Sequence, residues 1–156
     1  MKAKTEKRQP EGVLDYFALA LTTWGVGYIP GAPGTYGSLV GLLIYHLVTF
    51  TAESFEHGTA ESYRLSDAQT WAVINSGIAV ALLLFCLAGI WAAKRSIPLL
   101  GNEDPPEAVV DEVMGQLITF LFVPFLFSWP FIVAGFLLFR LFDIWKPYPI
   151  DDLQVL

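Results

Sequence analysis

The sequence predicts an all-α fold, a small multi-pass membrane helical bundle in which some helices are short or re-entrant. Two observations lead to this. The chain has 156 residues, 54% of them hydrophobic and only 15% charged, with a mean hydropathy of +0.53, whereas soluble domains usually carry about 25% charged residues. In addition, the run Trp71–Ala93 contains no charged residue. Too few charges remain to cover the outside of a water-soluble domain.

Composition also excludes several classes of protein. Intrinsic disorder requires low hydrophobicity, and a disulfide scaffold requires more than the single cysteine, Cys86. A net charge of −6 argues against a nucleic-acid-binding protein, which needs a basic surface. We expect one membrane domain over residues 13–152, preceded by a polar tail (1–12) and followed by a short tail (153–156).

The first apolar block, Phe17–Phe50, is interrupted by the glycine- and proline-rich segment Gly25–Gly34. The part after this break, Ser38–Phe50, is short for a membrane crossing. The second block, Trp71–Ala93, has 23 residues, enough at 1.5 Å per residue to cross a hydrocarbon core of about 30 Å. We therefore predict a transmembrane helix there.

The third block, Val113–Trp145, contains a Ser-Trp-Pro turn at Ser128–Pro130. Folding at this turn would produce two helices, Val113–Phe127 and Phe131–Ile144, each rather short for a full crossing. The alternative to a membrane bundle is a soluble one, because apolar runs of about 10–14 residues are often core helices.

Basic residues predict the orientation of the chain. They precede the first block, follow Trp71–Ala93 directly, and recur near the C-terminus, whereas Thr51–Thr70 has one basic residue against four acidic ones. The positive-inside rule then places both termini in the cytoplasm and Thr51–Thr70 outside, with four crossings. The Gly/Pro-rich break, the acidic stretch Asn102–Glu112 and the segment Arg140–Asp152 would meet at one membrane face.

The segment Gly31–Ser38 (Gly-Ala-Pro-Gly-Thr-Tyr-Gly-Ser) indicates a tight turn that leads into a helix. Ser38 would be the N-cap of that helix. A helix N-terminus with free N–H groups near the Thr35 and Ser38 hydroxyls is suited to bind an anion. Taken alone, the segment is also explained as a tight loop followed by a helix cap, without an anion-binding role.

The acidic stretch Asn102–Glu112 has two parts. Asp104, Pro105 and Glu107 have the pattern of a helix start with a capping box. Asp111 and Glu112 would lie inside this helix, with Gly115 leaving space for a ligand beside the carboxylates. Adjacent carboxylates without cysteine or histidine suit Mg²⁺, although a solvated helix end would also explain them.

Arg140, Asp143 and Lys146 recur every three residues in an apolar run and would lie on one flank of a helix. Arginine can bind a phosphate with two hydrogen bonds and lysine can add a positive charge. Asp143 could hold a metal ion or act as a nucleophile. The alternative is that Arg140 and Lys146 extend to lipid headgroups, with Asp143 as their internal partner.

Three blocks of the sequence, Gly27–Ser38, Val110–Gly115 and Phe139–Pro149, strongly resemble the phosphatidylglycerophosphatase A family in content and order. The resemblance extends from about Tyr16 to Asp152. It implies a multi-pass protein of the bacterial inner membrane that uses Mg²⁺ to dephosphorylate phosphatidylglycerophosphate to phosphatidylglycerol at the cytoplasmic face. It leaves the oligomeric state open.

The resemblance also assigns roles to residues of this chain. The catalytic candidates are Asp111, Asp143, Arg140 and Lys146; the substrate-binding candidates are Gly34, Thr35, Ser38, Arg140 and Lys146; the metal ligands would be Asp111, Glu112 and Asp143. Two alternatives remain. One is a related phosphatase acting on another phosphorylated lipid or a small phosphate ester, and the other is a non-catalytic membrane protein with a buried ion cluster.

Overall fold

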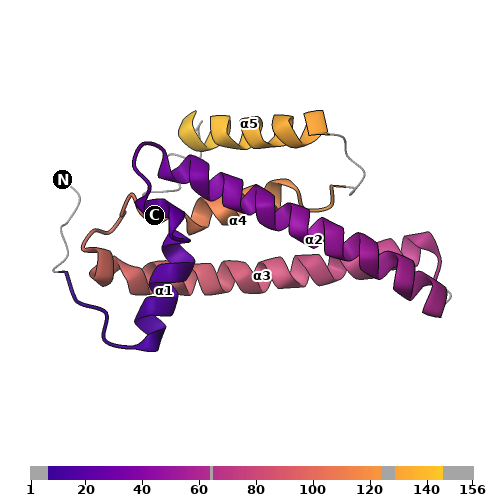
Figure 1. The fold of residues 1–156 in the computed structure, drawn as a ribbon, viewed down its shortest axis with the longest axis horizontal. Helices are drawn as coiled ribbons and strands as arrows, with labels where there is room; N and C mark the ends of the chain where they lie inside the picture. The colour runs from indigo at the N-terminus through magenta and orange to yellow at the C-terminus, as the bar shows by residue number, and fades with distance from the viewer. Residues whose placement is uncertain (1–6, 64, 124–128, 146–156) are drawn as a thin grey trace.

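The computed structural model describes residues 7–63, 65–123 and 129–145, and within these ranges the chain is helical with no strand (Figure 1). The predicted all-α class is confirmed. The elements are, in chain order, α1 (Val13–Thr23), the short 3-10 helix η1 (Val26–Tyr28), α2 (Pro33–Tyr63), α3 (Asp67–Leu100), α4 (Val110–Thr119) and α5 (Trp129–Trp145).

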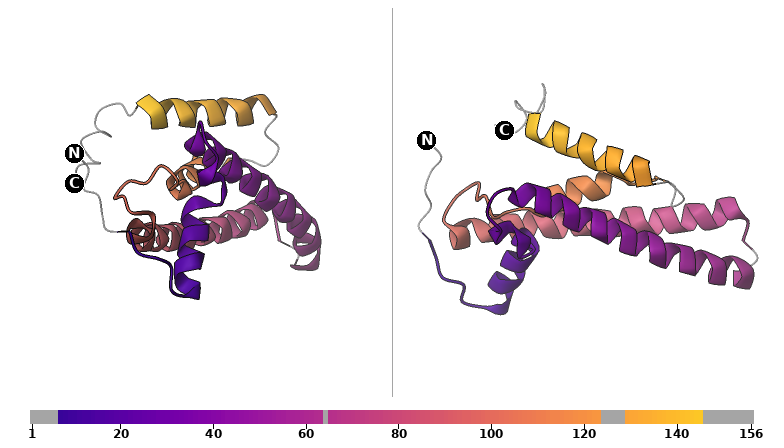
Figure 2. Two further views of the ribbon diagram at one scale, coloured as in Figure 1. Left: turned by 60° about the vertical axis from the view of Figure 1, so that its left-hand side comes forward. Right: turned by 45° about the horizontal axis from the view of Figure 1, so that its top comes forward.

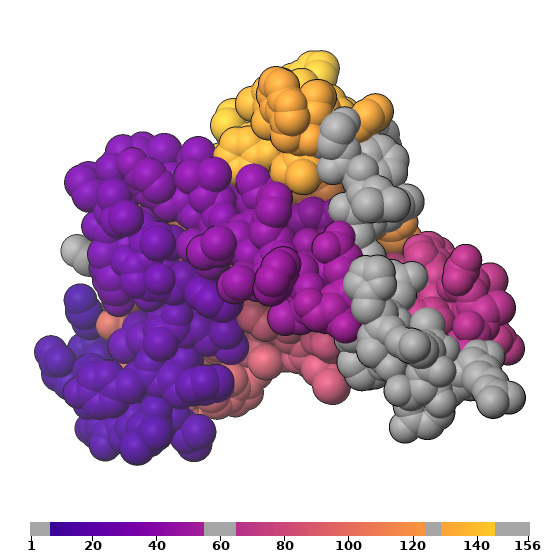
Figure 3. Space-filling view, turned by 45° about the vertical axis from the view of Figure 1, so that its right-hand side comes forward, coloured from indigo at the N-terminus to yellow at the C-terminus, as the bar shows by residue number. Residues whose placement is uncertain are grey.

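Two long antiparallel helices, α2 and α3, form the frame of the molecule (Figures 1 and 2). Helix α1 crosses α3 near one end of this frame, and α4 packs chiefly on α2 and to a lesser degree on α3. Helix α5 contacts α4 and α2 lightly and has no buried residue. In the space-filling view it stands out from the rest of the molecule beside α2 (Figure 3).

By length and composition, α2 and α3 could each cross a membrane. Helix α3 has 34 residues, which corresponds to about 51 Å, and it contains the predicted transmembrane segment Trp71–Ala93. Only 17% of its most apolar window is buried inside the molecule, whereas the core helix of a soluble bundle would be mostly buried. Its outward face remains apolar, with Val80, Leu83, Leu84, Leu87 and Ile90 all exposed. This exposure favours a membrane protein over a soluble bundle.

The predicted outer connection Thr51–Thr70 is mostly helical, because α2 continues to Tyr63 and α3 begins at Asp67. No proline interrupts the chain between Pro33 and Pro98, and polar side chains here bond to their own helix: the Thr51 and Ser54 hydroxyls donate to carbonyls of the preceding turn. Polarity therefore marks the end of the apolar region but not the end of the helix.

The predicted helix Val113–Phe127 is wrong at residues 120–123, which are not helical, and its last residues, 124–127, lie outside the described residues. Helix α4 ends at Thr119 and is followed by a turn in which Phe122 has a φ of +66°. Its ten residues span about 15 Å, so α4 is too short to be one of the four predicted crossings. The predicted partner helix Phe131–Ile144 lies within α5, and Ser128 lies outside the described residues.

The predicted helix start at Asp104–Glu107 is also wrong, because α4 begins at Val110 and its N-cap, Val109, makes no side-chain cap. The preceding segment is held by packing. The Val109 N–H donates to the Thr22 carbonyl at 2.9 Å, and a Cβ on Gly27 would lie 1.9 Å from the Glu107 carbonyl oxygen. Contacts with α1 and η1 therefore override the capping pattern.

A buried carboxylate connects the N-terminal segment to the end of α3. Asp15 is 1% exposed and accepts bonds from Arg8 (2.9 Å), Arg95 (2.8 Å) and the Glu11 backbone N–H (3.1 Å). The Glu11 N–H and the two guanidinium groups hold the pKa of Asp15 below its usual value, against the opposing effect of burial. A carboxylate with all these partners is a structural anchor.

We expect Asp15→Asn to lower the melting temperature of the protein in detergent at neutral pH. Because the pKa of Asp15 is lower in the folded than in the unfolded chain, its stabilisation is present above about pH 4 and is lost as pH falls through the folded pKa. The difference in melting temperature between wild type and variant should therefore shrink on acidification. Glu11→Gln, at an exposed side chain nearby, is the control and should have little effect; equal melting temperatures for Asp15→Asn and wild type would contradict the assignment.

Candidate functional site

Three stretches far apart in the chain meet at the end of the molecule where α2 and α4 begin and α5 ends (Figure 2). A Cβ on Gly34, in the first turn of α2, would lie 2.5 Å from the Glu112 Oε1 and 3.1 Å from the Arg140 Nη1. The missing side chain of Gly34 therefore lets a carboxylate of α4 and a guanidinium of α5 approach the start of α2. We call Gly34, Asp111, Glu112, Arg140 and Asp143 the acid–arginine cluster.

The guanidinium of the acid–arginine cluster has a carboxylate partner on its own helix. Arg140 and Asp143, one turn apart on α5, form a salt bridge through Nη1 and Oδ2. Their side chains are 14% and 28% exposed, so the pair is half-buried yet still reachable from outside. The Arg140 Nε is buried and has no hydrogen-bond partner among the described residues.

Glu112 is the carboxyl of the cluster that lacks a full set of partners. It lies on α4, outside the two helices that could cross a membrane. Burial, followed by the neighbouring Asp111 and then Asp143, raises the pKa of Glu112 to about 8. Its Oε2 is buried and unpaired within the described part of the chain. A proton or a cation would stabilise such a group.

The donor set of the cluster fits a hard cation in kind, because Asp111, Glu112 and Asp143 supply only carboxylate oxygens and the Glu112 Oε2 is unpaired. Asp111 is exposed beside Glu112. In residues 7–63, 65–123 and 129–145, however, no group of three or more His, Cys, Asp or Glu side chains lies close enough to hold a metal ion. Binding an ion with all three would require the carboxylates to converge.

The predicted role of Ser38 as a helix N-cap is wrong. Helix α2 begins at Pro33, so Ser38 lies inside it, fully buried, and its hydroxyl donates to the Gly34 carbonyl at 2.9 Å. Thr35 is half-buried in the first turn, where its N–H donates to the Ala32 carbonyl. Thr35 thus remains close to the cluster, whereas Ser38 supports the first turn of α2. Lys146 lies outside the described residues.

Gly115 does not leave room for a ligand. A Cβ at this position would lie 2.5 Å from the ring of Phe139, so the phenylalanine of α5 already occupies the space beside α4. Gly115 therefore sets the close packing of α5 on α4.

Sequence reasoning missed a strip of glycines on α2 and the amide that it faces. Gly34, Gly37 and Gly41 all face α4, and a Cβ on Gly41 would lie 2.9 Å from the Cβ of Gln116. Gln116 is fully buried, and both of its amide atoms lack partners among the described residues. The spacing of the glycines, three and four residues apart in an apolar helix, was the available signal for this close helix contact.

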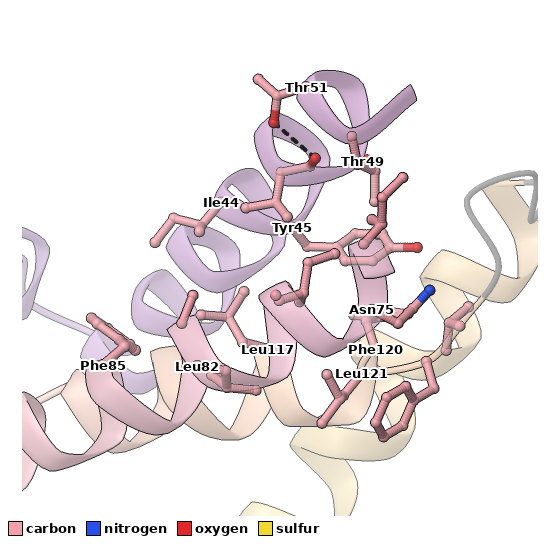
Figure 4. Close-up of a pocket in the computed structure, with 18 of the residues that line it drawn as sticks. Ile44, Tyr45, Thr49, Thr51, Asn75, Leu82, Phe85, Leu117, Phe120 and Leu121 are labelled. Carbon is pink, nitrogen blue, oxygen red and sulfur yellow. Dashed lines mark hydrogen bonds between the residues drawn. The ribbon is translucent and has the colours of Figure 1, made fainter. Parts of the chain in front are cut away.

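A large hollow lies away from the cluster. It has a volume of about 840 Å³ and lies between α2, α3 and the C-terminal end of α4 (Figure 4). Ile44, Leu82, Phe85, Leu117 and Leu121 are among the side chains that line it. The cavity is almost wholly apolar, so it lacks the groups that a reaction on phosphate requires. The acid–arginine cluster is therefore the candidate for the chemical site.

An apolar helical body with a half-buried arginine and three carboxyl groups at one end fits the class of small helical membrane proteins. More particularly, the chain belongs to the phosphatidylglycerophosphatase A family, whose sequence profile matches residues 19–156. The profile includes all the residues of the acid–arginine cluster. No solved structure is significantly similar to the chain.

Three relatives are similar to most of this chain. A protein of Bacteroides thetaiotaomicron, provisionally named phosphatidylinositol-3-phosphatase, is 36% identical over 138 residues, which are 85% of this chain and 73% of the relative. Phosphatidylglycerophosphatase A of Escherichia coli is 30% identical over 81% of this chain and 60% of its own length. Phosphatidylglycerophosphatase A of Haemophilus influenzae is 30% identical over 88% of this chain and 71% of its own length. The chain thus matches about three fifths of the length of the Escherichia coli protein.

Alanine substitutions at two glycines should separate packing from the site. We expect Gly27→Ala to abolish or severely weaken folding, because its Cβ would overlap the backbone carbonyl of Glu107, which cannot move alone. Gly34→Ala should keep the melting temperature close to wild type, since only the flexible end of Glu112 must shift. Thermal unfolding of both variants in detergent tests this; a well-folded Gly27→Ala protein would contradict the described packing.

We expect Gln116→Met to raise the melting temperature by about 2–4 °C, because an unpaired buried amide costs on the order of 1 kcal/mol or more and methionine removes it at similar volume. The same change at Gln69 should lower the melting temperature, since that side chain is bonded in the capping box of α3. Parallel thermal unfolding measures both. A clear loss of stability in Gln116→Met would show that the amide is paired in solution.

Proposed function

We propose that this protein is a Mg²⁺-dependent lipid phosphatase that converts phosphatidylglycerophosphate to phosphatidylglycerol. The observation that carries the proposal is the meeting of Gly34, Glu112 and Arg140 at one point, from three separate blocks of the chain. Membership of the phosphatidylglycerophosphatase A family and the names of two relatives support the substrate. The reaction is the hydrolysis of a phosphoric monoester.

Arg140 would bind the terminal phosphate of the substrate. Its guanidinium is now paired with Asp143, and a phosphate could replace that carboxylate with two parallel hydrogen bonds. Asp143 would then be free to turn toward Asp111 and Glu112. Lys146 would add a second positive charge to hold the remaining phosphate oxygens. Phosphoryl transfer depends chiefly on such positioning and charge stabilisation.

Asp111, Glu112 and Asp143 would hold Mg²⁺, which when bound neutralises negative charge on the phosphate oxygens. The unpaired Oε2 of Glu112 is the atom that most needs such a partner. Two routes are compatible with these residues. Either water attacks the phosphorus directly, or the Asp143 carboxylate attacks first and water then cleaves the aspartyl-phosphate. In both, the bond from phosphorus to the glycerol oxygen breaks and that oxygen gains a proton.

The start of α2 would bind the rest of the headgroup. Gly34 and Thr35 lie in its first turn beside Glu112 and Arg140, where the helix dipole favours an anion such as the phosphodiester phosphate. Ser38 contributes by supporting this turn through its bond to the Gly34 carbonyl. The headgroup would lie at the cytoplasmic face of the bacterial inner membrane, at the end of the molecule where α2 and α4 begin and α3 ends (Figure 1).

A second substrate is supported by one observation. The relative that is 36% identical is provisionally named phosphatidylinositol-3-phosphatase. Its named substrate also carries a phosphomonoester on a lipid headgroup, so the same cluster could bind it. The inositol ring is bulkier than glycerol, and the two substrates therefore differ in the space that they need beside Gly34 and Thr35.

We expect the purified protein to release phosphate from phosphatidylglycerophosphate in mixed micelles, and to lose this activity in EDTA and recover it with Mg²⁺. Asp143→Asn and Glu112→Gln should each lower kcat by about 100-fold, the typical effect of removing one charge-stabilising group. Gly34→Ala should also lower turnover, because its Cβ displaces the Glu112 carboxylate.

Glu103→Gln is the matched control, since Glu103 is exposed on the loop before α4 and outside the cluster. Phosphatidylinositol 3-phosphate should be assayed in parallel, and a higher kcat/KM for that lipid would favour the second substrate. Activity that survives EDTA would remove the metal from the proposal. A fully active Asp143→Asn protein would remove the cluster as the site.

A further inference from the structure

The apolar cavity of about 840 Å³ between α2, α3 and α4 has the size of a ligand pocket, which typically measures about 300–1,000 Å³. Its walls come from segments of α2 and α3 that are long and apolar enough to lie within a membrane. Trp24 and Phe85, in edge contact, line one part, and the turn after α4, including Phe122, lines another. The cavity is therefore a built feature of four segments and not a gap beside one helix.

Three polar side chains of the cavity wall are turned back onto their own helices. The Thr51 hydroxyl donates to the Val48 carbonyl (Figure 4). The Thr49 hydroxyl donates to the His46 carbonyl, and the Asn75 side-chain N–H donates to the Trp71 carbonyl. Each of these side chains thus has its donor satisfied within its own helix. Trp24, whose indole N–H has no partner among the described residues, and Tyr45 add two polar groups to the wall. Most of the remaining wall is hydrocarbon, which suits an apolar occupant.

The acid–arginine cluster and the cavity lie one after the other along the contact between α2 and α4. Along the α2–α4 interface, Glu112 lies against Gly34, and Phe120 stacks on Tyr45 at the cavity with ring centroids 4.7 Å apart. Phe120 follows Glu112 by eight residues, which corresponds to about 12 Å along a helix axis. A lipid has the same order, with its phosphate at the surface and its hydrocarbon deeper in the bilayer.

We propose that this cavity binds an acyl chain of the phospholipid substrate while the phosphate occupies the acid–arginine cluster. The inference rests on the proposed function, because it takes the substrate to be a phosphorylated diacyl lipid. The cavity then selects for substrates with long chains and orients the headgroup, since a chain held in the protein limits the positions that the phosphate can reach. A small phosphate ester lacks this contact.

Gly77 provides a direct test. It lines the cavity in the first third of α3, and a Cβ there would meet no atom within 4 Å. Gly77→Leu should therefore add a side chain to the cavity without a clash, and it should also stabilise the helix, because glycine is a poor helix former. We expect the variant to fold at least as stably as wild type. For long-chain phosphatidylglycerophosphate, kcat/KM should fall about tenfold, mainly through a higher KM. For dihexanoyl phosphatidylglycerophosphate, whose acyl chains are too short to occupy the cavity, kcat/KM should stay within twofold of the wild-type value.

Ala72→Leu is the matched control, because Ala72 is exposed on the same helix and does not line the cavity. This variant should leave kcat/KM unchanged for both substrates. If Gly77→Leu leaves kcat/KM unchanged for both substrates, or lowers it equally for both, the proposed acyl-chain site is overturned. An altered oligomeric state with equal effects on both substrates would also overturn it, because a second copy would then be the occupant. If wild type releases no phosphate from the long-chain lipid, the proposed function fails instead.

Discussion

The close approach of α2 and α4 is the constraint on which the rest of the structure depends. Gly34, Gly37 and Gly41 remove the side chains that would hold the two helices apart, and any Cβ at these positions would lie within 2.9 Å of an atom of α4 or of its N-cap residue, Val109. Helix α4 has only ten residues, so packing rather than intrinsic propensity must hold it. Once α4 is fixed, Glu112 is held at the start of α2. Helix α5 then packs on α4 through two contacts, Phe139 of α5 on Gly115 and Phe120 on Gly135 of α5.

Two charged clusters illustrate how differently an apolar protein can treat buried charge. Asp15 has two guanidinium groups and a backbone N–H as partners, which lower its pKa and make it an anchor between the N-terminal segment and α3. Glu112 is surrounded by other acids, its pKa is raised, and one of its oxygens is unpaired within the described residues. A satisfied carboxylate stabilises the fold, whereas an unsatisfied one has capacity left for a ligand. The contrast supports the placement of the chemistry at Glu112.

Helical content was predictable from the sequence, but several boundaries were not. Trp71–Ala93 was correctly placed in a helix because length and lack of charge are local properties of the chain. The helix starts at Ser38 and Asp104 were wrong, since capping patterns compete with contacts from distant segments, such as the Val109 N–H bound to the Thr22 carbonyl. Asp15 gave no local signal, because its partner Arg95 lies 80 residues away. Gly115 was read as open space, although Phe139 fills it.

The sequence by itself determined that the chain is an apolar helical protein, and its three motif blocks determined the family and the residue types of the site. These properties depend on composition and on short stretches, so they need no knowledge of contacts. Only the tertiary structure decided that Gly34, Glu112 and Arg140 meet, that Ser38 supports a helix turn, and that a large apolar cavity lies further along the α2–α4 contact. Such features arise from the packing of helices that are distant in the chain, and packing depends on which faces meet rather than on the order of residues.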